Sequence, residues 1–156
     1  MPMSRTLEQF LESRHISYEV LHHPPTSGAM YSAAEAHVPG DRLAKSVVLH
    51  DAMGYVVAVV PSTHRVDLGR LGRQLHRHLG LADEVDLAQL FGDCEPGAVP
   101  PVGPAFGLVT VIDDSLSEQP DVFFEAGDHE GLVHVSRTQF GSLMTGAERG
   151  RFSHHV

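Results

Sequence analysis

The amino-acid sequence predicts a single α/β (α+β) domain in which helices cover a mixed β-sheet. Its 156 residues are enough for one compact hydrophobic core and too few for two domains of ordinary size. Segments with the two-residue period of a strand are interleaved with segments of helical period. Several expected strands are apolar over their whole length, which favours a sheet covered by helices over an exposed antiparallel one.

The composition is that of an ordinary globular protein, with 42% hydrophobic and 20% charged residues. No apolar run approaches the roughly 18 residues of a membrane span, and the polar N-terminus lacks the apolar segment of a secretory signal. The one cysteine, Cys94, excludes an internal disulfide and is typical of a reducing compartment. We therefore expect a cytoplasmic protein with no membrane partner.

The net charge of −9 limits the nucleic-acid contacts that we expect. Extended binding requires clustered Lys and Arg side chains that neutralise phosphates. A local basic patch remains compatible with this charge, so a polynucleotide would be held at one end or one spot. We expect no DNA partner.

The first expected elements are a helix and a strand. Residues 4–14 have helical periodicity, with Ser4 or Thr6 available as the N-cap. Residues 16–23 alternate like a strand that stops at a pair of prolines. Residues 26–40 are typical of a loop that leads into a short alanine-rich helix.

The central part of the chain predicts two strands and the clearest helix. The strands, residues 43–51 and 55–61, are separated by a short turn. Residues 66–80 carry a stripe of leucines at helical spacing. Asp67 is suited to begin this helix and Gly80 to end it.

The last part of the chain continues the alternation of elements. We expect a helix at residues 83–91 and an irregular Gly- and Pro-rich segment at residues 91–107. Strands are expected at residues 108–114, 121–127 and 131–136, followed by a helix at residues 136–144 that Ser136 caps. Residues 148–156 are expected to fray. Because no repeat or linker interrupts the chain, we assign one domain to residues 1–150 and a C-terminal tail to residues 151–156.

Lys45 is the only lysine in the chain, against ten arginines, and it lies in an apolar strand. Strand alternation puts it on the same face as Val47 and Leu49. If that face is buried, the ammonium points into the interior or a cavity mouth, where it is costly without a partner and its pKa falls. Alternatively, the stem of Lys45 covers apolar surface while the ammonium reaches water. The residues alone leave both interpretations open.

The loop GAVPPVG, residues 97–103, is stiffened by two prolines, and its terminal glycines allow close backbone approach. Such a loop can aim backbone N–H groups at a developing oxyanion. The residues that keep an N–H group are Gly97, Ala98, Val99, Val102 and Gly103. A rigid connector between a helix and a strand is the alternative.

Residues 126–136, AGDHEGLVHVS, place Gly127, Asp128 and His129 at a turn between two strands. His129 could serve as a general acid or as a donor that positions a ligand near neutral pH. A solvated turn is the simpler interpretation.

Other catalytic patterns are absent from the sequence. The twelve histidines include no HExxH spacing, and there is no cysteine pair, so we expect no metal site. No partner can be assigned that would activate Cys94 as a nucleophile, and a lone cysteine is a common core residue. Walker, GxGxxG and GxSxG patterns are also missing.

Arg70, Arg73 and Arg77 are spaced to share one face of the central helix. In an acidic protein they are the best candidates for a patch that contacts phosphates. An ordinary solvated face opposite the leucines is the alternative.

Four segments, taken in order, carry a resemblance to one family: HHPPTS at 22–27, LAKSVVL at 43–49, the Gly-x-x-x-Pro pattern of Gly97–Pro101, and AGDHEGLVHVS at 126–136. Together they resemble the YbaK/ProX family of aminoacyl-tRNA deacylases, also found as an inserted editing domain in some prolyl-tRNA synthetases. The resemblance extends over roughly residues 5–145.

The resemblance implies a mixed, barrel-like sheet and a hydrolase that cleaves the ester of mischarged tRNA after the synthetase has released it. No cofactor is implied. The partners would be the tRNA acceptor end and an aminoacyl-tRNA synthetase. In the family, activity depends on the lysine at the position of Lys45. The expected substrate-binding residues are Met30, Tyr31, Ser46, Gly97, Ala98, Val99, Pro101, Gly103, Gly127 and His129.

The resemblance gives less information about which amino acid is removed from the tRNA. Met30 and Tyr31 match positions that gate the amino-acid pocket in relatives, which is compatible with a small side chain such as alanine, serine or 2-aminobutyrate. Val133 stands where the Cys-tRNA deacylases of the family carry an acidic residue, which argues against Cys-tRNA. Two other hypotheses remain: a catalytically silent module that binds the tRNA 3′ end and docks on a synthetase, and a metal-dependent hydrolase of small molecules.

Overall fold

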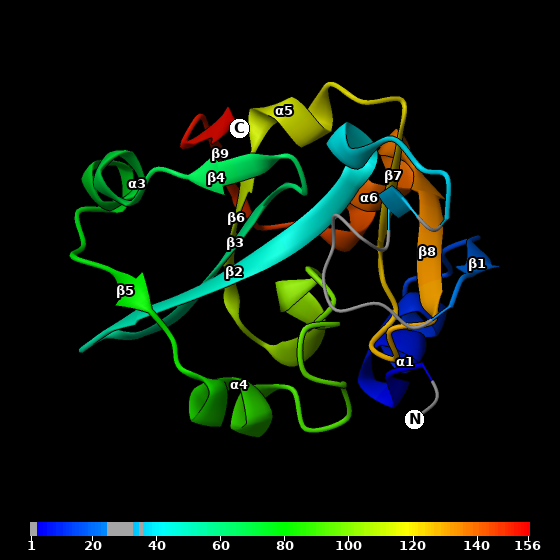
Figure 1. Ribbon diagram of the computed structural model, residues 1–156. Coiled ribbons are helices and arrows are strands. Elements are labelled where there is room, and N and C mark those ends of the chain that lie inside the picture. Colours follow the sequence, from blue (N-terminus) through cyan, green and yellow to red (C-terminus); the bar gives the residue numbers. More distant parts are fainter. Residues whose placement is uncertain (1–2, 25–32, 35) are drawn as a thin grey trace.

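The computed structural model describes residues 3–24, 33–34 and 36–156 (Figure 1). Met30 and Tyr31 lie outside this described part of the chain, as does most of the segment expected to hold a short helix within residues 26–40. The account below concerns the described residues.

The helices begin where short polar side chains cap them. They are α1 (Arg5–Ser13), α3 (Leu68–Leu75), α4 (Glu84–Leu90), α5 (Asp114–Ser117) and α6 (Arg137–Leu143), with 3₁₀ turns η1 (Gly40–Arg42) and η2 (Gly103–Phe106). The hydroxyl of Ser4 accepts a hydrogen bond from Leu7 N–H, and Asp67 and Ser136 cap α3 and α6 in the same way. Of the two residues expected to cap α1, Ser4 is the one that does so, and the expected caps of α3 and α6 are confirmed.

The strands form a mixed sheet, as predicted. They are β1 (Glu19–His22), β2 (Leu43–Asp51), β3 (Gly54–Pro61), β4 (His64–Val66), β5 (Gly80–Leu81), β6 (Val109–Asp113), β7 (Asp121–Glu125), β8 (Gly131–Ser136), β9 (Glu148–Gly150) and β10 (Ser153–His155). Eight of them make one sheet in the order β1-β8-β7-β2-β3-β6-β9, with β5 added to β2. Parallel and antiparallel pairs both occur, and the sheet is open rather than a closed barrel.

Helices cover both faces of this sheet. Alternate residues of β3 enter two different cores: Val57 and Val59 pack with side chains of α1, α5 and α6, whereas Val56, Ala58 and Val60 pack with Leu71 of α3. In Figure 1, α1 and α3 lie at opposite ends of the molecule. The completely apolar sequence of β3 follows from this coverage on both sides.

Helix α3 is shorter than the sequence predicts. It ends at Leu75 because His76 adopts a left-handed conformation, with φ +56°, and the chain folds back over the helix. A Cβ on Gly72 would lie 2.6 Å from the carbonyl oxygen of Arg77. The absence of a side chain at Gly72 therefore permits the early turn, and the expectation that Gly80 ends the helix was wrong.

The C-terminal segment is ordered, contrary to the expectation that residues 148–156 fray. Strand β9 pairs with β6, and β10 pairs with β4 in a separate two-stranded sheet. Between them, the side chain of Phe152 is fully buried beside Leu71 and Val111. The expectation failed because burial of one aromatic side chain holds an otherwise polar segment in place.

Candidate active site

The segment around Lys45 borders an opening in the sheet. On one edge of β2, Leu43 and Ala44 pair with β7, whereas Leu49 and His50 pair with β5. Residues 45–48, between these pairs, have no strand partner on that edge among the described strands. Figure 1 shows β2 and β7 close together at the upper end of β2 and diverging below it.

Lys45 is half-buried beside the β3–β4 connection. Its strand partner is Val60, and its Nζ donates a long hydrogen bond of 3.5 Å to the carbonyl oxygen of Ser62. Burial, and next the positive charge of Arg65, lower the pKa of Lys45 below its ordinary value. No described carboxylate forms an ion pair with this ammonium, so its charge is available for an anion or a polarised carbonyl.

Ser46 connects β2 to the glycine–proline loop through a hydrogen bond. Its Oγ donates a hydrogen bond of 3.4 Å to the carbonyl oxygen of Val99. Because neighbouring side chains of a strand point to opposite faces, Lys45 and Ser46 project to different sides of β2. Ser46 thus makes the described contact between this strand and the loop. Lys45 precedes it in the chain, and its side chain projects to the other side of the strand.

The loop offers fewer free N–H groups than the sequence suggests. Ala98 N–H donates to the carbonyl of Glu95, and Gly103 N–H donates to the carbonyl of Pro101. Val102 is completely buried. Gly97 and Val99 remain, since their N–H groups donate to no other described residue. The five candidate oxyanion donors are thereby reduced to these two.

Gly103 has a packing role that accounts for its lack of a side chain. A Cβ at this position would lie 2.0 Å from Oγ1 of Thr110 and 3.3 Å from Cβ of Val57. Gly103 itself is buried. The close approach that the sequence predicts for this glycine is therefore an approach to strands β3 and β6.

The β7–β8 turn is attached to Glu95 and Pro96, the two residues just before the same loop. The carbonyl of Gly127 accepts a hydrogen bond of 2.8 Å from Glu95 N–H, and a short hydrogen bond joins Nε2 of His129 to the carbonyl of Pro96. Because a carbonyl only accepts, Nε2 carries the hydrogen. Nδ1 of His129 is buried without a hydrogen-bond partner among the described residues. The donor of the His129 ring is thus used to hold the loop.

Gly127 occupies a site where a larger residue does not fit. Its φ is +102°, and a Cβ there would lie 2.9 Å from Cβ of Ser4 and 3.4 Å from Sγ of Cys94. Burial raises the pKa of the Cys94 thiol to about 12, so at neutral pH it is a protonated thiol and not a nucleophile.

Direct contacts thus join three segments. Ser46 of β2 contacts the glycine–proline loop, and the β7–β8 turn contacts the residues just before this loop.

The chemistry available here is the stabilisation of negative charge. Strand β2 offers one half-buried ammonium, on the side opposite to Ser46, and the loop offers two backbone N–H groups that donate to no described residue. Within the described residues, no cluster of three His, Cys, Asp or Glu side chains is arranged to hold a metal. Such an arrangement suits hydrolysis by a positioned water, with the oxyanion held by donors.

The three candidate tRNA-contacting arginines do not share one helical face. Arg70 and Arg73 lie on α3, but Arg77 lies beyond its end and is bound to Asp51 of β2. This difference is a consequence of the early end of α3.

Arg65 and Ser62 are neighbours of Lys45 that the sequence did not reveal. Both follow β3, and the β3–β4 turn returns them to the side of β2 on which the ammonium lies. No local pattern in the sequence reports such a contact, because it depends on the pairing of β2 with β3.

Comparison with known proteins identifies a family. The model of the family described as "Aminoacyl-tRNA editing domain" matches residues 23–142. No curated protein matches the sequence significantly. None of the described helices combines the length and apolar character needed to cross a membrane.

Solved structures share the fold over the whole chain. A scaffold protein from a study of computational epitope grafting has a TM-score of 0.84 at 26% identity, with 100% of this chain and 99% of that chain covered. A candidate trans-editing enzyme for prolyl tRNA synthetase has a TM-score of 0.83 at 27% identity, with 99% and 98% covered. A hypothetical protein of 23% identity has a TM-score of 0.84, with 96% and 100% covered, and supports the fold alone.

The family match includes β2, the glycine–proline loop and the β7–β8 turn, which are the segments joined by direct contacts. It also covers most of the chain, and the fold agrees with that of the solved structures over nearly their full length. The protein therefore belongs to the aminoacyl-tRNA editing domain family.

Proposed function

We propose that this protein is a trans-editing hydrolase that cleaves the ester bond of mischarged aminoacyl-tRNA carrying a small amino acid. The observation that carries the proposal is that β2, which holds Lys45, contacts the glycine–proline loop, and that the β7–β8 turn contacts the residues just before this loop, in a member of an editing family. The similarity to a candidate trans-editing enzyme for prolyl tRNA synthetase supports action on tRNA that a synthetase has released.

Lys45 supplies the positive charge for the reaction. Its ammonium binds the terminal phosphate of the tRNA or polarises the ester carbonyl. Partial burial strengthens either interaction, because water screens the charge less than at an open surface. A compact ammonium on a flexible stem can follow the shift of charge onto the carbonyl oxygen.

The N–H groups of Gly97 and Val99 are the proposed oxyanion donors. A water molecule attacks the ester carbonyl carbon and forms a tetrahedral oxyanion. The bond to the ribose oxygen then breaks, that oxygen takes up the proton lost by the water, and the free amino acid leaves. Since the ester is activated, positioning of the water and stabilisation of the oxyanion suffice without a covalent nucleophile.

The substrate pocket includes the remaining predicted residues. We assign Ser46, Ala98, Pro101, Gly103, Gly127 and His129 to its wall or to the contacts that hold its wall in place. Met30 and Tyr31 remain predicted gate residues. A hydrophobic pocket discriminates by only about 1–3 kcal/mol for each methylene group, so a size limit separates neighbouring amino acids weakly.

The replacement Lys45→Ala tests the assignment. We expect at least a 100-fold loss of deacylation, the order of effect for one oxyanion donor, with thermal unfolding near that of the wild type because Lys45 has no described ion pair. The substrates are alanyl-, seryl-, cysteinyl- and aminobutyryl-tRNA. Lys45→Arg is the matched control that keeps the charge. Undiminished turnover by Lys45→Ala would overturn the role of this residue.

A silent tRNA-end binding module is the second candidate, favoured by the lack of an activated nucleophile among the described residues of the region: Cys94 is a protonated thiol, and the hydroxyl of Ser46 donates to the carbonyl of Val99. The same substrate panel separates the two. A silent module binds mischarged tRNA and returns it intact, whereas the hydrolase releases free amino acid. Absence of release from every member of the panel, with binding retained, selects the module.

A further inference from the structure

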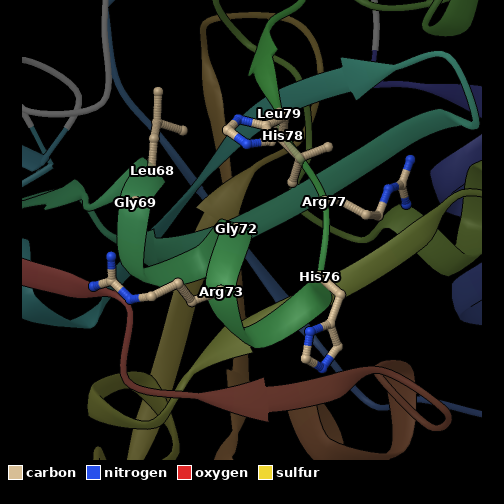
Figure 2. Close-up of a pocket in the computed structure, with 8 residues that line it drawn as sticks. All are labelled: Leu68, Gly69, Gly72, Arg73, His76, Arg77, His78 and Leu79. Atoms are coloured by element: carbon tan, nitrogen blue, oxygen red, sulfur yellow. The ribbon is translucent and has the colours of Figure 1, made fainter.

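A groove runs along α3, with a volume of about 460 Å³. Its lining residues are Leu68, Gly69, Gly72, Arg73, His76, Arg77, His78 and Leu79 (Figure 2). None of them is acidic, although the chain as a whole has a net charge of −9. Basic and imidazole side chains are thus gathered at one place on an acidic protein.

The cations of the groove differ in how they are engaged. Arg77 makes a bidentate pair with Asp51, and in Figure 2 its side chain points away from that of Arg73. No ion pair joins Arg73 to another described residue. Its Nη1 lies 3.5 Å from the place that a Cβ on Gly69 would occupy, so the guanidinium lies over the bare helix backbone at that glycine. Oδ1 of Asp67 lies 3.5 Å from the same place but forms no ion pair with Arg73. Because Arg73 is also exposed, it is the arginine of the groove that an anion can reach.

Glycines form part of the groove wall and let neighbouring groups approach the helix closely. Gly69 and Gly72 are three residues apart on α3 and lie beside each other on the helix surface. The place of a Cβ on Gly72 lies 2.6 Å from the carbonyl oxygen of Arg77, and that of a Cβ on Gly69 lies 3.5 Å from Nη1 of Arg73. The missing side chains therefore let the following chain and the guanidinium of Arg73 lie close to the helix.

Further cations connect the groove with Lys45. Arg65 of β4 is near enough to lower the pKa of Lys45, and its partner in the β4–β10 sheet is His154. The backbone N–H of Arg70, and next the charges of Arg70 and Arg73, lower the pKa of the Asp67 carboxyl at the start of α3. Arginine side chains therefore continue from Lys45, through Arg65 of β4, to α3.

We propose that the α3 groove, through Arg73, binds a backbone phosphate of the RNA whose 3′ end lies at Lys45, with Arg65 between them. The inference rests on the proposed function and assigns its RNA-contacting surface. Arginine suits this role because its planar guanidinium can contact two phosphate oxygens at once. The phosphodiester backbone of RNA is favoured over an acidic protein segment as the ligand, because the arginines extend from the groove to Lys45, the residue assigned to the RNA 3′ end.

The test is binding of a fluorescent RNA hairpin, an acceptor stem with a free CCA end, measured by anisotropy between 50 and 200 mM salt. For Arg73→Glu we expect at least a fivefold weaker Kd and a slope of log Kd against log salt that is smaller by about one, as for loss of one phosphate contact. Arg73→Gln should weaken binding less, and its thermal unfolding shows that the effect is not loss of fold.

Arg5→Glu is the matched control, because it changes the net charge equally. Arg5 is exposed at the start of α1, at the other end of the molecule from α3 in Figure 1. We expect it to bind the hairpin like the wild type. Equal Kd and salt slope for Arg73→Glu and Arg5→Glu overturn the inference, as does failure of the wild type to bind the hairpin.

Two further outcomes separate this inference from the proposed function. Hairpin binding that depends on Arg73, without hydrolysis of any aminoacyl-tRNA, leaves the groove assigned and removes the hydrolase. If Arg73→Glu binds RNA normally and instead loses association with prolyl-tRNA synthetase, the groove is a protein-binding surface and the inference is wrong.

Discussion

Asp51 and Arg77 form a bidentate ion pair that joins the end of β2 to the chain beyond α3. Nε of Arg77 lies 2.7 Å from Oδ2 of Asp51, and Nη2 lies 2.5 Å from Oδ1. The same guanidinium donates to the carbonyl of Gly54. The two side chains are only 14% and 15% exposed. Paired, two-point contacts of this kind fix geometry as well as neutralising charge.

This pair makes stability depend on acid pH. The hydrogen bond from Arg77 lowers the pKa of Asp51 to about 2 from its ordinary 3.8. Since the folded pKa is the lower one, the stabilisation is complete above about pH 4 and is lost as the pH falls towards 2. Asp51→Asn should therefore unfold more easily than the wild type at pH 7, and the difference should shrink below pH 4.

Urea unfolding at pH 7, 5 and 3 measures this difference. Asp114→Asn, at a more exposed carboxylate with a longer contact to Arg151, is the control. A gap between wild type and Asp51→Asn that stays constant from pH 7 to 3 would contradict the assigned pair.

At the scale of elements, α3 shows how two glycines on one helix can have opposite roles. A Cβ on Gly69 would make only ordinary contacts, at 3.5 Å from Arg73 and Asp67. A Cβ on Gly72 would lie 2.6 Å from a backbone oxygen of Arg77, which a side-chain rotation cannot relieve. Gly69 is thus compatible with alanine, and Gly72 is not.

The same replacement should change stability in opposite directions at these two sites. Gly69→Ala should raise the free energy of unfolding by about 0.5–1 kcal/mol, because alanine is the better helix former. Gly72→Ala should lower it by about 1–3 kcal/mol, because the chain after the helix must move. Urea denaturation of the two variants beside the wild type measures both, and a stabilising Gly72→Ala would refute the close approach.

Individual elements were predictable where the signal is local. Strand β2 has the predicted bounds and β3 differs by one residue, because β-branched runs bounded by a turn identify strands. The cap at Asp67 was found from residue type, and Ser4 was one of the two residues expected to cap α1. The end of α3 was missed, because a left-handed His76 is not a pattern that sequence reveals.

At the scale of the whole molecule, the C-terminal segment closes one side of the fold. Phe152 N–H donates to Oδ2 of Asp113 at the end of β6, and its carbonyl accepts from Asp67 N–H at the start of α3. Its side chain fills the core between Leu71 and Val111. One residue near the C-terminus therefore connects a strand, a helix and a core.

Loss of the Phe152 side chain should strongly lower the stability of the protein. We expect Phe152→Ala to lower the free energy of unfolding by about 3–5 kcal/mol, the cost of an aromatic cavity. Val156→Ala, at a side chain that is 66% exposed, should change it by less than about 0.5 kcal/mol. Chemical denaturation measures both, and equal effects would mean that the segment does not seal the core.

The candidate site was predictable in its parts and not in its assembly. The strand of Lys45, the glycine–proline loop and the β7–β8 turn were each recognisable in the sequence, and the family that they indicated is confirmed. The reduction of the oxyanion donors to Gly97 and Val99 depends on turns that use the other N–H groups. Likewise, the proximity of Arg65 to Lys45 arises from the pairing of β2 with β3.

The sequence by itself determined the alternation of strands and helices, the capped helix starts and the family, because these depend on neighbouring residues and on short motifs. Only the tertiary structure decided that Asp51 binds Arg77, that Phe152 is buried, and which cations lie near Lys45. The physical reason is that strand register and core packing bring these residues together from 15 or more positions apart, and short-range sequence patterns do not encode such distances.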